Sequence, residues 1–108
     1  MTCLLGLLEY RILRNLYGIL TRNGITSPHE VLKQTCLELG NNEEALFKCV
    51  ENNYSSMWKV ANTLAALGYI SVDRLGNRIA LLKWRGGDTD FTKVLMDYIN
   101  HKESTKAR

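Results

Sequence analysis

Six polar or amphipathic side chains share one face of the segment 54–67, and their chemistry is that of recognition. Apolar residues at positions 57, 60, 61, 64 and 67 follow helical spacing and predict a buried face. The positions left to face outward are Ser55, Ser56, Trp58, Lys59, Asn62 and Thr63. Hydroxyl and amide groups both donate and accept hydrogen bonds, and lysine adds a positive charge. Such a set can contact a polar, anionic partner.

Basic residues are concentrated in the same part of the chain. Residues 54–86 carry five basic side chains against one acidic, whereas residues 1–50 carry five of each. Arg74, Asn77 and Arg78 stand around a predicted turn between two strand-like runs. Phosphate contacts supply most of the affinity of non-specific DNA binding. The local excess therefore indicates a duplex-DNA partner more strongly than the modest net charge of +3 does.

These side chains must be positioned by the elements around them. The sequence predicts helices over 3–22, 28–39, 43–51, 54–67 and 88–101, a short extended piece at 25–26, and strands over 69–72 and 79–84. Ser27, Asn42 and Asp88 are the expected N-caps, and Gly24 and Gly68 are among the expected helix stops. The predicted fold class is mainly α with a small β-hairpin (α+β).

Residues 55–64, followed by Leu67, Gly68, Tyr69 and Ile70, carry a family pattern. The pattern resembles the winged helix-turn-helix superfamily of transcription regulators, including the MarR-type and PadR-type families. There the recognition helix begins with small hydroxyl residues and ends in a leucine, a glycine and an apolar strand start. The resemblance covers roughly residues 12–84 in layout and 55–84 in detail. It implies a recognition helix, 54–67, in the major groove and a wing, 73–78, on the DNA backbone or minor groove.

The chain departs from the family pattern in two places. An extra helix, 43–51, is inserted before the recognition helix, and the wing lacks the acidic–basic signature of MarR-type wing tips. We expect a DNA-binding domain over 1–87, a C-terminal dimerisation helix over 88–101 and a polar tail over 102–108.

A homodimer follows from the family resemblance and from spare apolar surface on the first and last helices. The expected interface residues are Leu4, Leu5, Leu8, Phe91, Leu95, Tyr98 and Ile99. Alternatively, the last helix folds back and extends the core of its own domain.

Roles within the DNA contact can be assigned by position. Ser56, Lys59 and Asn62 are candidates for contacts with the bases. Arg74 and Arg78 are candidates for contacts with the DNA backbone. The serines could instead only cap the helix, and Lys59 and Asn62 could form an ordinary solvated face.

The two tryptophans have different expected environments. Trp58 either faces the DNA or packs on the wing or the inserted helix. Trp84 is expected in the core.

The three cysteines show no metal-binding spacing. Cys36 and Cys49 fall on predicted apolar helix faces, the former with Val31, Leu32 and Leu39. We expect them to be reduced and to pack as small hydrophobes, with a redox or metal role as the alternative.

The sequence also argues against several function classes. It contains no paired carboxylates, nucleophile–base set or phosphate-binding glycine loop, so we expect no enzyme, metal, cofactor or small-molecule ligand. It has no apolar run long enough to span a bilayer and no signal-peptide pattern, so we expect a cytoplasmic protein of viral or microbial type. The competing function is a winged-helix module that binds protein within a larger assembly.

Overall fold

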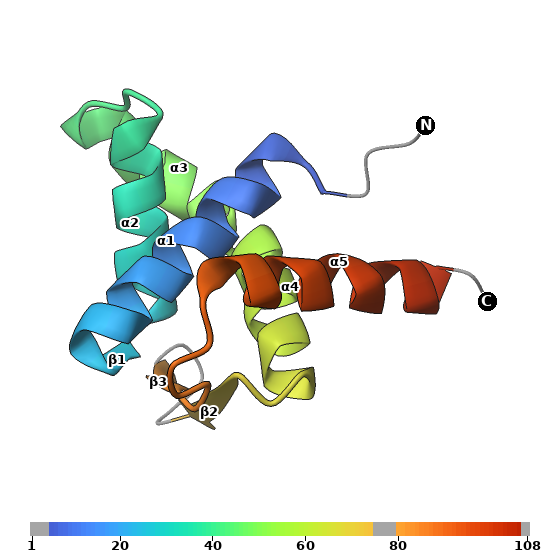
Figure 1. Cartoon of the computed structure of the whole chain (residues 1–108). Coiled ribbons are helices and arrows are strands. Elements are labelled where there is room, and N and C mark those ends of the chain that lie inside the picture. Colours follow the sequence, from blue (N-terminus) through green and yellow to red (C-terminus); the bar gives the residue numbers. More distant parts are fainter. Residues whose placement is uncertain (1–4, 75–79, 107–108) are drawn as a thin grey trace.

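The computed structural model describes residues 5–74 and 80–106. Over these residues the chain is mainly helical with a small antiparallel sheet, which confirms the predicted α+β class (Figure 1). The helices are α1 (Leu7–Asn23), α2 (Pro28–Glu38), α3 (Glu43–Asn52), α4 (Tyr54–Ala66) and α5 (Phe91–Lys106). The strands are β1 (Ile25–Thr26), β2 (Ile70–Arg74) and β3 (Ala80–Trp84). Leu4, Asn77 and Arg78 lie outside the described residues.

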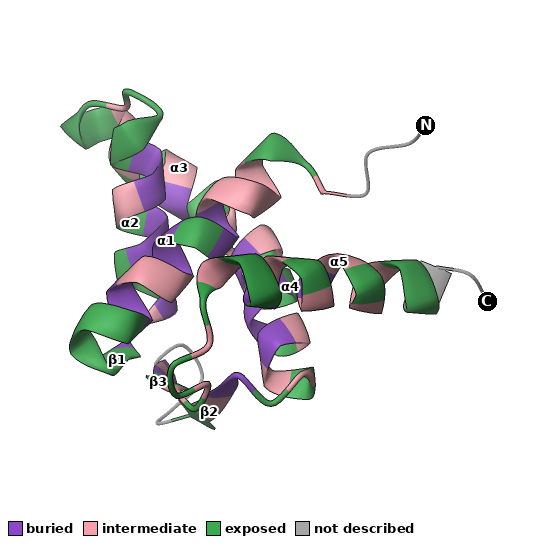
Figure 2. Cartoon of the chain, in the orientation of Figure 1, coloured by how far each residue is buried: buried purple, intermediate pink, exposed green. Residues whose placement is uncertain are grey.

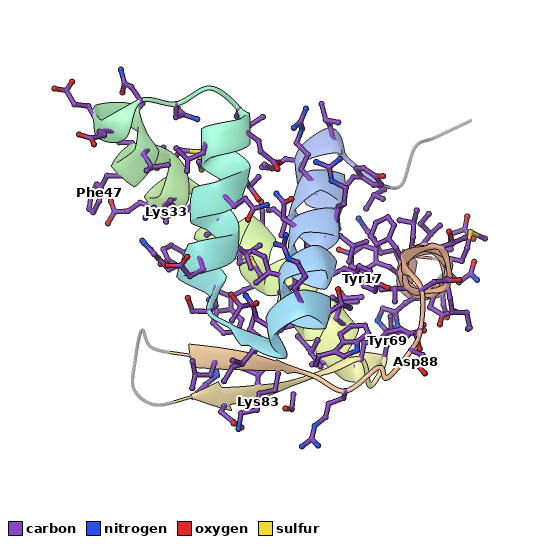
Figure 3. The ribbon with its side chains drawn as sticks, turned by 60° about the vertical axis from the view of Figure 1, so that its left-hand side comes forward. Tyr17, Lys33, Phe47, Tyr69, Lys83 and Asp88 are labelled. Atoms are coloured by element: carbon purple, nitrogen blue, oxygen red, sulfur yellow. A yellow bond between two sulfur atoms is a disulfide. The ribbon has the colours of Figure 1, made fainter. Side chains whose placement is uncertain are left out.

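The three strands form one sheet in the order β1-β3-β2, and both neighbouring pairs are antiparallel. β2 and β3 form a hairpin in which Ile70 is opposite Trp84 and Arg74 is opposite Ala80. Side chains alternate along a strand, so buried Leu82 faces the helices and Lys83 faces away from them (Figure 3). The helices therefore cover one side of the sheet.

Four helix ends follow the predicted local signals. The side-chain oxygens of Ser27 and Asn42 accept hydrogen bonds from backbone N–H groups three residues on, at 3.2 and 2.9 Å. α1 ends at Gly24 and α4 is followed by Gly68, with φ angles of 78° and 85°. Only glycine adopts this left-handed conformation without steric cost, so the chain can leave both helices sharply.

The core lies where α1, α2 and α4 pack together above the sheet (Figure 2). Met57, Val60, Ala61 and Leu64 of the predicted α4 stripe are fully buried. Its last member, Leu67, is only half-buried, because α4 ends one residue before it. Leu39 is exposed, contrary to prediction, because α2 ends one residue before it. Among the helices of the described part of the chain, none is both long and apolar enough to span a membrane.

The cysteines correct one prediction. Cys36 of α2 and Cys49 of α3 form a disulfide, with a Cα–Cα distance of 6.1 Å, and so are not reduced. The sequence shows only that each cysteine lies on the apolar face of its helix. The packing of α3 against α2 brings the two sulfur atoms together, and the bond ties the inserted helix to the core.

α5 differs from prediction at both ends. It begins at Phe91, because Asp90 rather than Asp88 accepts the capping hydrogen bond, from the Lys93 N–H at 2.9 Å. It continues to residue 106 instead of ending at 100 or 101. The extension includes Lys102, whose ammonium forms a 2.7 Å ion pair with Glu9 of α1. This ion pair between residues far apart in sequence therefore holds Lys102 against α1, although the segment 102–108 was expected to be a polar tail.

Candidate nucleic-acid interface

The exposed face of α4 carries three of the six residues predicted to point outward. Ser55, Lys59 and Asn62 are exposed, whereas Ser56, Trp58 and Thr63 are half-buried. The helical pattern alone predicts one outward face on which all six residues are equally exposed. The structure narrows that face because α4 is flanked by β2 on one side and by α5 on the other. A narrow polar face of one helix remains open to a partner.

The serines at the start of α4 are not caps. The N-cap is Asn53, and no side chain makes a capping hydrogen bond there. The Asn53 amide instead donates to the Cys49 carbonyl at 2.7 Å. Ser55 and Ser56 therefore lie within the first turn, which removes the capping alternative. An N-terminus without a side-chain cap keeps backbone N–H groups directed outward along the helix axis.

Trp58 packs against the β2–β3 hairpin, which was one of the two alternatives for it. Its ring is half-buried against the core, and the guanidinium carbon of Arg74 lies 4.5 Å from the ring centroid. Arg74 is itself exposed at the end of β2. The hairpin thus places its cation directly beside α4.

The opposite flank of α4 is occupied by α5. The Thr63 hydroxyl donates to the Lys59 carbonyl at 2.9 Å and also neighbours the Tyr98 hydroxyl. The positive charge of Lys59 also helps, as the smallest of several causes, to lower the pKa of Glu9 of α1. The Thr63 hydroxyl is therefore already engaged in contacts within the domain.

The positive charge counted over 54–86 is divided between two surfaces. Arg74 lies on the helix side of the sheet, with Ile70 and Val72, whereas Lys83 lies on the other side. There the Lys83 ammonium forms a 3.0 Å ion pair with Asp73. Of the basic residues counted over 54–86, Lys59 and Arg74 therefore lie at the exposed face of α4 and Lys83 does not, while Arg78 lies outside the described residues.

Two residues absent from the sequence prediction stand at the edge of this face. The hydroxyl of Tyr54, the first residue of α4, is 3.5 Å from Nδ1 of His29 in the first turn of α2. The contact sets the beginnings of the two helices side by side. Neither residue has a sequence signal for this role, because their proximity depends on the angle between α2 and α4.

Most of the predicted dimer-interface residues contact their own domain. Leu5, Leu8, Phe91 and Leu95 are half-buried against the core, Ile99 is half-buried, and Tyr98 is fully buried. Tyr98 therefore has no surface to offer to a second copy, which corrects that assignment. The exposed apolar side chains of the two helices are instead Leu7, 70% exposed, and Met96, 50% exposed.

A charged cluster fastens α5 to α1. The Tyr98 hydroxyl donates to the Glu9 carboxylate, which also receives the Lys102 ammonium. Burial alone would raise the pKa of Glu9, but the hydrogen bonds from Lys102 and Tyr98 outweigh it and hold that pKa below its ordinary value. Burial and the bond to Glu9 raise the pKa of Tyr98.

The rings around α5 complete the attachment. Phe91 packs on Tyr10 and Tyr17, and Trp84 packs on Tyr17 and Tyr69, at centroid distances of 5.4 to 6.0 Å. Trp84 was predicted in the core, but it is half-buried in this cluster and packs against the core from its edge. The beginning of α5 is thus part of the domain, as the fold-back alternative has it.

In residues 5–74 and 80–106, no group of three or more His, Cys, Asp or Glu side chains could hold a metal ion. The face formed by Ser55, Lys59 and Asn62, with Arg74 beside it, offers hydrogen bonds and positive charge. No family model, curated protein or solved structure matches the chain.

Proposed function

We propose that this protein binds duplex DNA as a winged helix-turn-helix regulator, with α4 as the recognition helix and the β2–β3 hairpin as the wing. The element order and the β1-β3-β2 sheet support this fold, with α3 as an inserted helix and α5 as an addition. The observation that carries the proposal is the exposed face of α4. It bears Ser55, Lys59 and Asn62, while its opposite face is fully buried.

The major groove accepts one α-helix, and the chemistry of this face suits its contents. Asn62 can form paired hydrogen bonds with the edge of an adenine, and Lys59 can reach guanine or a phosphate. The start of α4 near Ser55, which has no side-chain cap, is favourable for a phosphate because its N–H groups and the helix dipole both attract anions. Arg74, which lies beside the helix, extends the contact to the DNA backbone.

A titration of mixed-sequence duplex against salt tests the proposal. Two phosphate contacts per protein chain, from Lys59 and Arg74, predict a slope of log affinity against log salt of about −2 for each bound chain. Lys59→Ala should reduce that slope by about one. Lys83→Ala is the matched control, because it removes the same charge from the far side of the sheet. Absence of binding at low salt would refute the proposal.

Selection of bound DNA from a random pool tests the assignment of Asn62. Asn62→Ala should relax preference at one or two base positions and leave non-specific affinity almost unchanged. An equal loss of affinity for every sequence would remove Asn62 from base contacts.

The homodimer remains part of the proposal, with revised residues. Figure 1 shows α5 extending beyond the rest of the domain on the side where α1 begins. Leu7 of α1 and Met96 of α5 are exposed apolar side chains, and Met96→Glu should shift sedimentation to the monomer mass. A symmetric half-site motif in the selected DNA would support the dimer independently.

A protein partner is the second candidate, and one observation favours it. Phe47 of α3 is 67% exposed and points away from the core (Figure 3), and Leu37 and Leu39 at the end of α2 are also exposed. Large exposed apolar side chains are typical of contact surfaces. Salt-insensitive or absent DNA binding, with unaltered folding, would favour this alternative over the DNA proposal.

The cytoplasmic location also stays within the proposal, since it follows from a DNA partner. Disulfides persist mainly in oxidising compartments and in the intracellular proteins of hyperthermophiles. The Cys36–Cys49 bond is therefore the observation to weigh against it. Rapid alkylation of thiols in lysed cells would show in which state the protein is kept.

A further inference from the structure

Among the described residues, a contact between Trp58 and Arg74 links α4, the proposed recognition helix, to β2 of the proposed wing. The guanidinium carbon of Arg74 lies 4.5 Å from the centroid of the Trp58 ring. Arg74 shares the helix-facing side of β2 with Ile70 and Val72, so the strand itself directs it toward α4. The ring is held in turn because Trp58 packs against the core.

The contact leaves part of the guanidinium group open to an anion. Neighbouring Asp73 is paired with Lys83 on the other side of the sheet, and no carboxylate among residues 5–74 and 80–106 forms an ion pair with Arg74. An arginine stacked on an aromatic ring has one flat side covered, while its N–H groups project from the edge of the plane. That edge can bind a phosphate through two parallel hydrogen bonds.

The position of the pair relates this cation to the exposed face of α4. Ser55 precedes Trp58 by three residues and Asn62 follows it by four, so both lie on neighbouring turns of the same side of the helix. Arg74 therefore borders the face that we propose to enter the groove. A phosphate at this border would belong to the same stretch of duplex.

We infer that Trp58 is a positioning residue, whose ring holds the Arg74 guanidinium ready for a backbone phosphate of the bound duplex. The inference rests on the proposed function. Ordering a long side chain before binding reduces the entropy lost on binding. Loss of the ring should therefore lower affinity about two- to fivefold, the factor that corresponds to a cation–π contact at an exposed site.

The test compares salt-dependent binding of one duplex by the wild type, Trp58→Leu, Trp58→Phe, Arg74→Ala and the double variant Trp58→Leu/Arg74→Ala. Arg74→Ala should reduce the salt slope by about one, and Trp58→Leu should move the slope toward the same value. Trp58→Phe keeps an aromatic ring and should stay close to the wild type. The double variant should bind no more weakly than Arg74→Ala. Lys83→Ala, on the far side of the sheet, should leave the slope unchanged.

Three results would overturn the inference while leaving the proposed function intact. They are an unchanged affinity in Trp58→Leu, an equal loss from Trp58→Leu with and without Arg74, and a slope change in Lys83→Ala as large as in Arg74→Ala. A wild type that binds no duplex would overturn the proposed function, and the inference with it. Thermal unfolding of each variant is measured first. If Trp58→Leu does not fold, Trp58→Met, which also lacks the ring, decides: a slope moved toward that of Arg74→Ala supports the inference, and wild-type slope and affinity refute it.

Discussion

Reduction of the Cys36–Cys49 disulfide should destabilise the protein by a predictable amount. The two cysteines are 13 residues apart in sequence. The entropy of closing a loop of that size in the unfolded chain corresponds to about 3 kcal/mol at room temperature. An unfolding entropy of about 2.1 cal/mol/K per residue gives about 0.23 kcal/mol/K for this chain, so the melting temperature should fall by about 13 °C.

The location of the bond indicates where the loss is felt first. In α3 only Val50 is fully buried, while Leu46 and Cys49 are partly buried against the core. The helix therefore depends on the disulfide more than the other helices of the described chain do. Hydrogen exchange after reduction should increase most over α3 and over the Asn53 junction, because the Asn53 amide bonds to Cys49.

The assay is thermal unfolding followed by circular dichroism, with and without reductant, in a Cys3→Ser background that prevents thiol exchange. The double variant Cys36→Ala/Cys49→Ala is the control, since reductant should not change its melting temperature. Thiol titration of the unreduced, denatured wild type should find one free cysteine of the three in the chain. Three free thiols, or equal melting temperatures before and after verified reduction, would refute this reasoning.

Three further predictions concern the attachment of α5 and one helix end. Tyr98→Phe removes a hydrogen bond to a carboxylate and should cost about 2 kcal/mol, seen as a melting temperature lower by about 9 °C; a change below one degree would contradict it. The folded-state pKa of Glu9 lies below its ordinary value of 4.5, so its stabilising contribution is present above that pH and is lost as the pH falls through the folded pKa. Glu9→Gln should therefore show a smaller loss of stability on acidification than the wild type, and parallel curves would exclude the cluster as a source of acid sensitivity. Gly68→Ala should lower the free energy of unfolding by about 1 to 2 kcal/mol, measured by urea denaturation, because φ is 85° there; equal stability would show that the backbone relaxes.

Much of the fold could be predicted because its signals are local. Helix caps such as Ser27 and Asn42, and the stop at Gly68, depend on residues within one turn of the chain. The buried stripe of α4 is equally accessible, since helical spacing alone places its residues on one face. The α+β class follows from the order of these segments.

The candidate site could be predicted only in part. Helical spacing gives the direction of Ser55, Lys59 and Asn62, and these are exposed as expected. It gives no information on what stands beside the helix, so the half-burial of Thr63 and the contact of Trp58 with Arg74 could not be derived. Both depend on the path of β2 and α5 over α4.

The sequence by itself determined which segments become helices and strands, and which side of each is apolar, because backbone propensity, capping and periodicity act over a few residues. Only the tertiary structure decided which elements meet. It formed the Cys36–Cys49 bond, folded α5 onto α1 through Glu9 and Lys102, and placed Arg74 and Lys83 of the hairpin on opposite sides of the sheet. The physical reason is that burial and Coulomb interactions depend on distance in space. Glu9 and Lys102 are 93 positions apart, and no local sequence pattern predicts that they meet.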